Sequence, residues 1–176
     1  MTPIFYNTRG ARLVENGCMA NTVKAIPEGS EGATPYLSIK GAADAIEFYK
    51  KAFGATETMR MAGPDGRIAH AEIKIGKARI MLADEHPEIR FLSPRTLGGS
   101  PVTIHIYVED IDALAAQAEA AGAKVVRAVA DQFYGDRTGG FEDPFGHVWH
   151  FATRKEDLSN EELQRRAAAQ GAGGKS

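Results

Sequence analysis

Hydrophobic and polar positions follow the same order twice along the chain. In the first pass, Thr34–Lys40 has the alternation of a strand, and from Ala42 to Phe53 apolar residues recur at helical spacing. Gly54 then stands where a left-handed helix cap is needed. Three strands are predicted to follow, in Glu57–Met61, Arg67–Ile75 and Lys77–Ala83. The order is one strand, one helix and three strands, or βαβββ.

The second pass repeats this order about 69 residues later, as the distance from Leu37 to Ile106 shows. It begins with a strand in Val102–Glu109 and a helix that Asp110 caps. Three more strands are predicted in Lys124–Ala128, Gly139–Glu142 and His147–Thr153. A fixed offset between whole units indicates a duplicated module. Two such modules bury their faces against each other, and we expect a cup that holds a ligand.

The pattern divides the chain into six segments, in an α+β fold of two βαβββ modules. We predict an N-terminal extension in 1–33, the first module in 34–84, a linker without regular structure in 85–100, the second module in 101–153, a C-terminal helix in 154–170 and a disordered tail in 171–176. Met19 is a possible alternative start, which would make residues 1–18 an addition.

Composition narrows the classes of partner. The 176 residues are 43% hydrophobic and carry a formal net charge of −2 with both signs interleaved, so we expect no nucleic-acid partner. No run reaches the roughly 18–20 apolar residues of a membrane span, so we expect no membrane partner either. The single Cys18 and the absence of a secretory signal pattern favour a cytoplasmic protein.

Several motifs of the chain resemble the vicinal oxygen chelate superfamily (glyoxalase I, bleomycin-resistance proteins, fosfomycin-resistance enzymes and extradiol dioxygenases), in particular its PhnB-like branch. They are Pro35-Tyr36-Leu37, residues 45–55 (AIEFYKKAFGA), His70-Ala71-Glu72-Ile73, residues 131–137 (DQFYGDR) and Asp143-Pro144-Phe145-Gly146-His147. The resemblance implies two modules whose curved sheets form a cup around a small molecule, often in a homodimer.

The resemblance also implies where a metal would be bound. Metal-dependent members carry His, Gln or Glu at four cup-facing strand positions, which fall here on Thr34, Ile80, Thr103 and His150. Of these, His150 alone is a strong ligand. The usual divalent-metal site is therefore expected to be degenerate, and the cofactor is left unassigned.

Period-two alternation predicts which side chains line the cup. The predicted residues are Tyr36, Ser38, His70, Glu72, Thr103, His105, Tyr107, Val148, His150 and Ala152. Among them His70, Glu72, His105 and His150 could converge as a rearranged site for Zn²⁺ or Fe²⁺. Alternatively, a histidine, with His105 and His150 as the candidates, acts as general base without a metal and a tyrosine donates a hydrogen bond. In a third reading these side chains only support the sheets.

Residues 131–137 are predicted to form a loop at the mouth of the cup. Tyr134 offers aromatic surface and Arg137 a guanidinium that can bind a carboxylate or phosphate. The alternative is an Asp136–Arg137 or inter-module ion pair that fixes the loop. His147 is expected to face out or cap the turn in a structural role, His86 to be solvent-exposed, and Trp149 to lie in the core.

Three functions stay open at this point. The first is a small-molecule lyase, isomerase or dioxygenase-type enzyme using His105 or His150. The second is a binding protein of the drug-resistance type that sequesters its ligand, because three of the four implied metal positions lack a strong ligand. The third is an interaction module that assembles through the charged helix from Ser159 to Ala169.

Overall fold

The computed structural model describes residues 23–30 and 32–173. The chain divides into two units, Met1–Gly32 and Ala33–Ser176, and both modules belong to the second. The predictions about residues 1–18, Cys18 and the start at Met19 lie outside the described residues.

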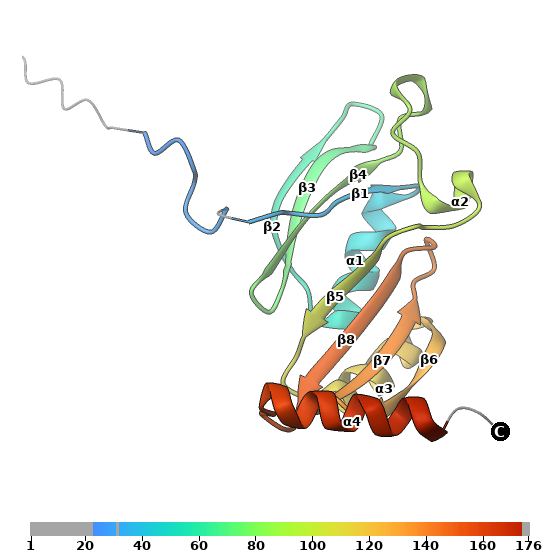
Figure 1. The fold of residues 1–176 in the computed structure, drawn as a ribbon. Coiled ribbons are helices and arrows are strands. Elements are labelled where there is room, and N and C mark those ends of the chain that lie inside the picture. Colours follow the sequence, from blue (N-terminus) through green and yellow to red (C-terminus); the bar gives the residue numbers. More distant parts are fainter. Residues whose placement is uncertain (1–22, 31, 174–176) are drawn as a thin grey trace, which may run out of the picture. The chain divides into compact units, whose positions relative to one another are not determined.

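Each module forms one four-stranded sheet and one long helix (Figure 1). The first module contains β1 (Tyr36–Ile39), α1 (Ala42–Phe53), β2 (Thr56–Ala62), β3 (Ile68–Ile75) and β4 (Ala78–Asp84). The second contains β5 (Thr103–Tyr107), α3 (Ile111–Ala121), β6 (Lys124–Asp131), β7 (Asp136–Glu142) and β8 (Val148–Arg154). The strand orders are β1-β4-β3-β2 and β5-β8-β7-β6. The predicted α+β fold of two βαβββ modules is confirmed.

The last strand of each module caps the helix of that module. Asp84 at the end of β4 accepts hydrogen bonds from the backbone N–H groups of Gly41 and Ala42, both at 3.0 Å. In the second module, Thr153 accepts from the Ile111 N–H at 2.9 Å, and Asp110 accepts from the next two amides. The duplicated helices therefore begin at matching places through different side chains.

The two modules share one hydrophobic core. The helices α1 and α3 pack against each other, and the apolar face of each sheet covers them. Tyr49 and Phe53 of α1 lie 5.2 and 5.1 Å from Trp149 of β8, measured between ring centroids. Trp149 is fully buried, as predicted. The helix of the first module thus packs on the sheet of the second.

Asp143, which is 3% exposed, joins the modules by hydrogen bonds. One carboxylate oxygen accepts from the Tyr49 hydroxyl at 2.8 Å and from Trp149 Nε1 at 2.9 Å. The other accepts from the backbone N–H groups of Phe145 and His147, both at 2.9 Å. The turn that begins at Asp143 therefore also connects the two modules.

Two sequence predictions about segments are wrong, and a third is confirmed only in part. Residues 85–100 were predicted to have no regular structure, but they contain a 3₁₀ helix, η1 (Pro87–Ile89), and α2 (Pro94–Leu97), in which Ser93 caps the first turn. The segment 131–137 was predicted to be a loop; residues 132–135 do connect β6 and β7, whereas Asp131, Asp136 and Arg137 belong to the strands. The C-terminal helix α4 (Asn160–Gly173) continues beyond Gly171, where a disordered tail was predicted. None of the helices in residues 23–30 and 32–173 combines the length and apolar character of a membrane span.

Candidate functional site

The face of the second sheet that points away from the helices carries two adjacent histidines. In the parallel pair β5 and β8, His105 stands directly opposite His150. Along β5 the exposed residues Thr103, His105 and Tyr107 alternate with the buried Ile104 and Ile106. This alternation is the predicted one, and we call this surface the second open face.

The His150 ring lies over a glycine of the next strand. A Cβ on Gly140 of β7 would come within 2.9 Å of His150 Nε2, so a side chain there would force the imidazole to shift. Burial, and then the positive charges of Arg127 and His105, lower the pKa of His150. His150 is therefore a neutral imidazole near pH 7 and can accept a proton or a hydrogen bond.

Two further hydroxyls belong to the second open face. Tyr107 donates a 2.5 Å hydrogen bond to Asp136, and this bond, with partial burial, raises the pKa of the tyrosine. Thr138 is buried, and its hydroxyl has no hydrogen-bond partner. A buried hydroxyl of this kind is available to water or to a ligand.

The corresponding face of the first sheet, the first open face, carries a chain of polar side chains. The Tyr36 hydroxyl lies 2.8 Å from His70 Nδ1. His70 Nε2 lies 3.7 Å from Glu72, whose other oxygen lies 3.6 Å from Arg79 Nε. The Tyr36 ring is also held edge-on against Phe91 of the linker, with centroids 5.4 Å apart.

A cavity of about 430 Å³ opens at the edge of the first open face. Tyr36 and Ser38 of β1 line it, together with linker residues that include Arg90 and Phe91. The Ser38 side chain is 8% exposed, and its hydroxyl has no hydrogen-bond partner. The cavity thus combines apolar walls with one unsatisfied polar group.

The predicted convergence of four side chains on one metal is not found. His70 and Glu72 lie together on one sheet and His105 and His150 on the other. Within the described part of the chain, no three His, Cys, Asp or Glu side chains are grouped so as to hold a metal ion. These residues do not fit a divalent-metal site.

The family position assigned to Ile80 is also wrong. Ile80 is 1% exposed and opposes Ile73 on the core side of the sheet. The cup-facing neighbour is Met81, which stands opposite Tyr36 as His150 stands opposite His105. The prediction aligned the turn glycines Gly76 and Gly146 of the two modules. These glycines are not at equivalent places, because the β3–β4 connection has two residues and the β7–β8 connection five. The resulting slip of one residue moves the predicted position to the opposite face of the sheet.

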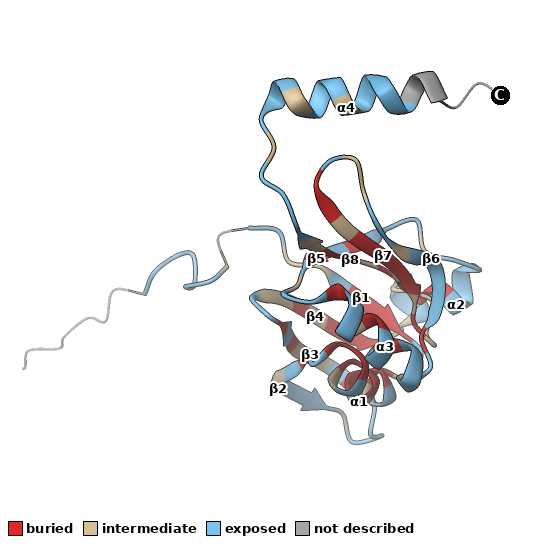
Figure 2. Cartoon of the chain, turned by 90° about the horizontal axis from the view of Figure 1, so that it is seen from below, coloured by how far each residue is buried: buried red, intermediate tan, exposed pale blue. Residues whose placement is uncertain are grey.

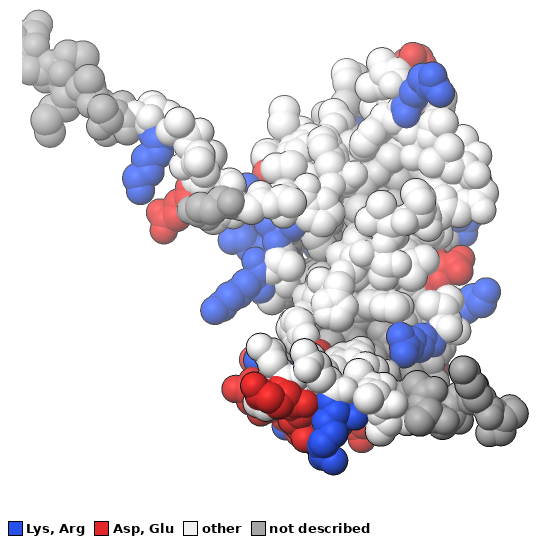
Figure 3. Space-filling model, viewed as in Figure 1, with Lys and Arg blue, Asp and Glu red and all other residues white. Residues whose placement is uncertain are grey.

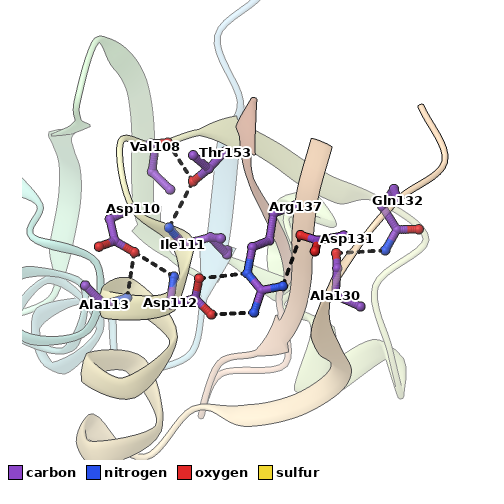
Figure 4. Close-up of polar contacts among 10 residues, drawn as sticks. All are labelled: Val108, Asp110, Ile111, Asp112, Ala113, Ala130, Asp131, Gln132, Arg137 and Thr153. Carbon is purple, nitrogen blue, oxygen red and sulfur yellow. Dashed lines mark hydrogen bonds and ion pairs between the residues drawn. The ribbon is translucent and has the colours of Figure 1, made fainter. Parts of the chain in front are cut away.

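Arg137 is held by ion pairs rather than left free for a ligand (Figure 4). Its guanidinium donates to both oxygens of Asp112 at 2.7 Å and to Asp131 at 3.1 Å. An ion pair does fix Arg137, but neither predicted form is found, because the partners are Asp112 and Asp131 of the same module. Tyr134 is part of the four-residue β6–β7 connection and packs edge-on against Phe133.

Other histidine predictions need correction as well. His147 has the structural role that was expected, but it is buried rather than facing out, and its Nε2 lies 3.2 Å from the backbone oxygen of Ser38 in the other module. His86 is only partly exposed and lies 2.9 Å from Glu88. Sequence reasoning missed Arg90, Phe91, Arg127 and Thr138. Alternation indicates the face of Thr138 once β7 is placed, whereas Arg90 and Phe91 depend on the linker fold.

Comparison with known proteins agrees with this architecture. The family model of the Glyoxalase/Bleomycin resistance protein/Dioxygenase superfamily matches residues 36–151 of the chain. The uncharacterized protein Mb0911c of Mycobacterium bovis is 43% identical over 143 residues, which are 80% of this chain and 94% of that protein.

Solved structures extend the similarity. The Arabidopsis thaliana gene product At5g48480 has a TM-score of 0.56 and 29% identity, covering 69% of this chain and 97% of that one. The fosfomycin resistance protein FosX of Listeria monocytogenes has a TM-score of 0.54 and 18% identity, covering 78% and 98%. At that identity FosX supports the fold alone, and the PhnB-like branch stays a prediction. From the matched residues and the two modules, the chain belongs to the Glyoxalase/Bleomycin resistance protein/Dioxygenase superfamily.

Proposed function

We propose that the protein binds a small, largely apolar organic molecule in the cavity beside Tyr36 and Ser38. The observation that carries the proposal is the Ser38 hydroxyl, which is buried at the cavity and has no hydrogen-bond partner. Buried polar groups are nearly always paired, so this hydroxyl is expected to pair with a bound molecule or water.

The lining of the cavity indicates the class of ligand. Its walls are mainly apolar and include Phe91, Leu92, Leu97, Val102 and Ile104. Arg90 supplies a positive charge at the same cavity, whereas burial lowers the pKa of His147 and keeps that ring neutral. Figure 3 shows that much of the body surface in this view is uncharged. These features suit an aromatic or aliphatic molecule with a single carboxylate.

The test is a thermal-shift screen followed by calorimetry with benzoate, 2-naphthoate and the matching uncharged amides. We expect the carboxylates to bind more tightly than the amides. Arg90→Ala should weaken carboxylate binding by about tenfold and leave amide binding unchanged, since a charge-assisted hydrogen bond contributes about 1.5–3 kcal/mol. Ser38→Ala should weaken both ligands while stabilising the free protein, because it removes an unsatisfied buried hydroxyl.

Arg137→Ala is the matched control, because its guanidinium is already paired with Asp112 and Asp131. It should leave binding unchanged. A panel in which no compound binds would contradict the proposal, as would equal losses in the Arg90 and Arg137 variants.

A second candidate function is acid–base catalysis on the second open face by His105 and His150, the lyase or isomerase alternative. Its support is the lowered pKa of His150, which leaves a neutral imidazole on the same open face as the unpartnered Thr138 hydroxyl. Turnover of a bound compound that disappears in His150→Gln would favour catalysis. Stoichiometric binding without turnover would favour sequestration.

A homodimer is part of the same proposal, because the two open faces of one chain do not bring their histidines and carboxylate into one group. A second copy would bring further side chains to the open faces. A monomer mass measured by light scattering would contradict the proposed homodimer.

A further inference from the structure

We propose that Tyr36, His70 and Glu72 form a proton-transfer site in which His70 accepts the phenol proton of Tyr36 and Glu72 stabilises the imidazolium that results. The site lies on the first open face, and Tyr36 also lines the proposed ligand cavity. The inference therefore rests on the proposed function for its substrate, but its chemistry can be tested without one.

The geometry provides the order in which the proton moves. The Tyr36 hydroxyl is 2.8 Å from His70 Nδ1, a normal hydrogen-bond distance. The Glu72 carboxylate lies 3.7 Å from Nε2, the other ring nitrogen. A carboxylate on that side favours the tautomer with its proton on Nε2, so Nδ1 is left as the acceptor for the phenol. The arrangement is that of a nucleophile, a base and an orienting carboxylate.

The elements hold these groups in place from three directions. Tyr36 stands on β1, while His70 and Glu72 are alternate residues of β3 and so share one face. Phe91 packs on the Tyr36 ring from the linker, and Arg79 on β4 lies 3.6 Å from the second oxygen of Glu72. The tyrosine remains accessible, with 47% of its surface exposed.

Tyr107 provides a contrast in the same molecule. It occupies an edge strand of the second module as Tyr36 does in the first, and it is more exposed, at 58%. Its hydroxyl, however, donates to the carboxylate of Asp136, and this bond raises the pKa of Tyr107. Ionising Tyr107 would place two negative charges together, whereas the proton of Tyr36 has a base to receive it.

A phenolate that acts as a base suits a carbonyl compound with an acidic neighbouring C–H group. Met81 stands opposite Tyr36, and Met59 and Met61 stand opposite Glu72 and His70, so the face offers adaptable apolar surface. In the reaction, the proton of Tyr36 passes to His70 Nδ1 and the phenolate oxygen removes the proton from the carbon. The C–H electron pair becomes a C=C bond as the carbonyl electrons move to oxygen. Tyr36 then gives a proton back to the enolate and recovers its own from His70 Nδ1, so both groups end as they began and no oxidant or reductant is needed.

The test uses 4-nitrophenyl acetate as a probe of phenolate reactivity in the full chain. The Tyr36 phenolate attacks the ester carbonyl, 4-nitrophenolate leaves with the electron pair, and the acetyl group stays on Tyr36. Peptide mapping by mass spectrometry then measures the labelling rate of each tyrosine. We expect Tyr36 to be acetylated at least about tenfold faster than Tyr107, although Tyr107 is the more exposed.

The variants separate the role of each group. His70→Gln should slow labelling of Tyr36 by about a hundredfold, the size of a general-base effect, and leave Tyr107 unchanged. Glu72 is a positioning residue, so Glu72→Gln should slow Tyr36 labelling less and should shift the ¹⁵N resonances of His70 away from the Nε2–H tautomer.

Tyr107 labelled as fast as Tyr36 in the wild-type protein would overturn the proposal without any variant. An unchanged Tyr36 rate in His70→Gln would overturn it as well. If benzoate or 2-naphthoate binds but Tyr36 is not selectively labelled, the proton-transfer site is contradicted and the proposed function is not. If Tyr36 is selectively labelled but no compound binds, the proposed function alone fails.

Discussion

His147 shows how a single buried side chain connects the modules. It follows the turn that Asp143 organises, and its Nε2 lies 3.2 Å from the backbone oxygen of Ser38. Because a carbonyl oxygen can only accept, this ring nitrogen carries the proton and donates it. Burial lowers the pKa of His147, so the ring stays neutral in the folded protein.

This neutral histidine makes stability depend on pH in a defined direction. Above the ordinary pKa of about 6.5 both folded and unfolded states are neutral at this residue, and it has no effect. Below that pH the unfolded chain binds a proton that the folded chain does not. We expect the free energy of unfolding to fall, by up to about 1.4 kcal/mol per pH unit from His147, until the lowered folded pKa is reached.

Urea unfolding at a series of pH values between about 7 and 5 checks this prediction. The comparison is His147→Gln, whose amide can still donate to Ser38 but does not titrate. The variant should lose less stability over that range than the wild-type protein. His150, whose pKa is also lowered, is present in both proteins, so the difference between them belongs to His147. Parallel curves would show that His147 does not couple to folding.

For a single residue, the sequence predicts the environment of the side chain where strand alternation alone decides which face of the sheet it occupies. Alternation was sufficient for His105 and Tyr107, which share the exposed side of β5. It could not show that Arg137 forms an ion pair with Asp112, because that contact joins strand β7 to helix α3, which is distant in sequence. It also could not show that His147 reaches Ser38 in the other module.

The C-terminal helix α4 differs from the other long helices in having almost no buried surface (Figure 2). Its charges pair with one another: Glu162 binds Arg165 and Arg166, and these ion pairs lower the pKa of Glu162 to about 2. Arg166 also binds Glu156 at 2.7 Å and the backbone oxygen of Phe133 at 3.4 Å. Local pairs of this kind stabilise the helix more than they attach it to the body.

Removing residues 160–176 should therefore leave the body intact. We expect the free energy of unfolding to change by less than about 1 kcal/mol, since exposed ion pairs contribute about 0–1 kcal/mol. Urea unfolding followed by Trp149 fluorescence measures this. Arg166→Ala, which removes only the contacts to Glu156, Glu162 and Phe133, is the control and should behave in the same way. A large loss in the deletion alone would mean that α4 packs on the body.

Light scattering of the same deletion also tests assembly. If α4 mediates association, the mass should fall when residues 160–176 are removed. An unchanged mass would assign any dimer to the edges or open faces of the sheets.

At the scale of elements, the order of strands and helices could be predicted because hydrophobic periodicity and turn residues are local. The ends of β6 and β7 could not, because residues 131–137 contain the turn-forming Asp, Gly and aromatic residues of a loop. Backbone pairing extends both strands into that segment, with Asp131 opposite Arg137. Register across β4 was missed for a related reason, since the two hairpin connections differ in length.

For the molecule as a whole, duplication of sequence did not produce two independent domains. Phe53 of the first module lies 4.9 Å from Phe151 and 5.1 Å from Trp149 of the second. Asp143 adds the hydrogen bonds to Tyr49 and Trp149 across the same boundary. Separating the modules would expose these rings and leave a buried carboxylate without its partners, which is costly.

We therefore expect the two modules to unfold together. Trp149 is the single tryptophan and packs at the boundary, so its fluorescence reports the junction, while far-UV circular dichroism reports the helices and strands of both modules. The two signals should give one urea midpoint, the mark of a two-state transition. Phe53→Ala should lower the free energy of unfolding by about 3–5 kcal/mol and shift both signals equally, because the cavity it leaves lies in a shared core. A fluorescence change that precedes the loss of secondary structure would show instead that the modules come apart before either unfolds.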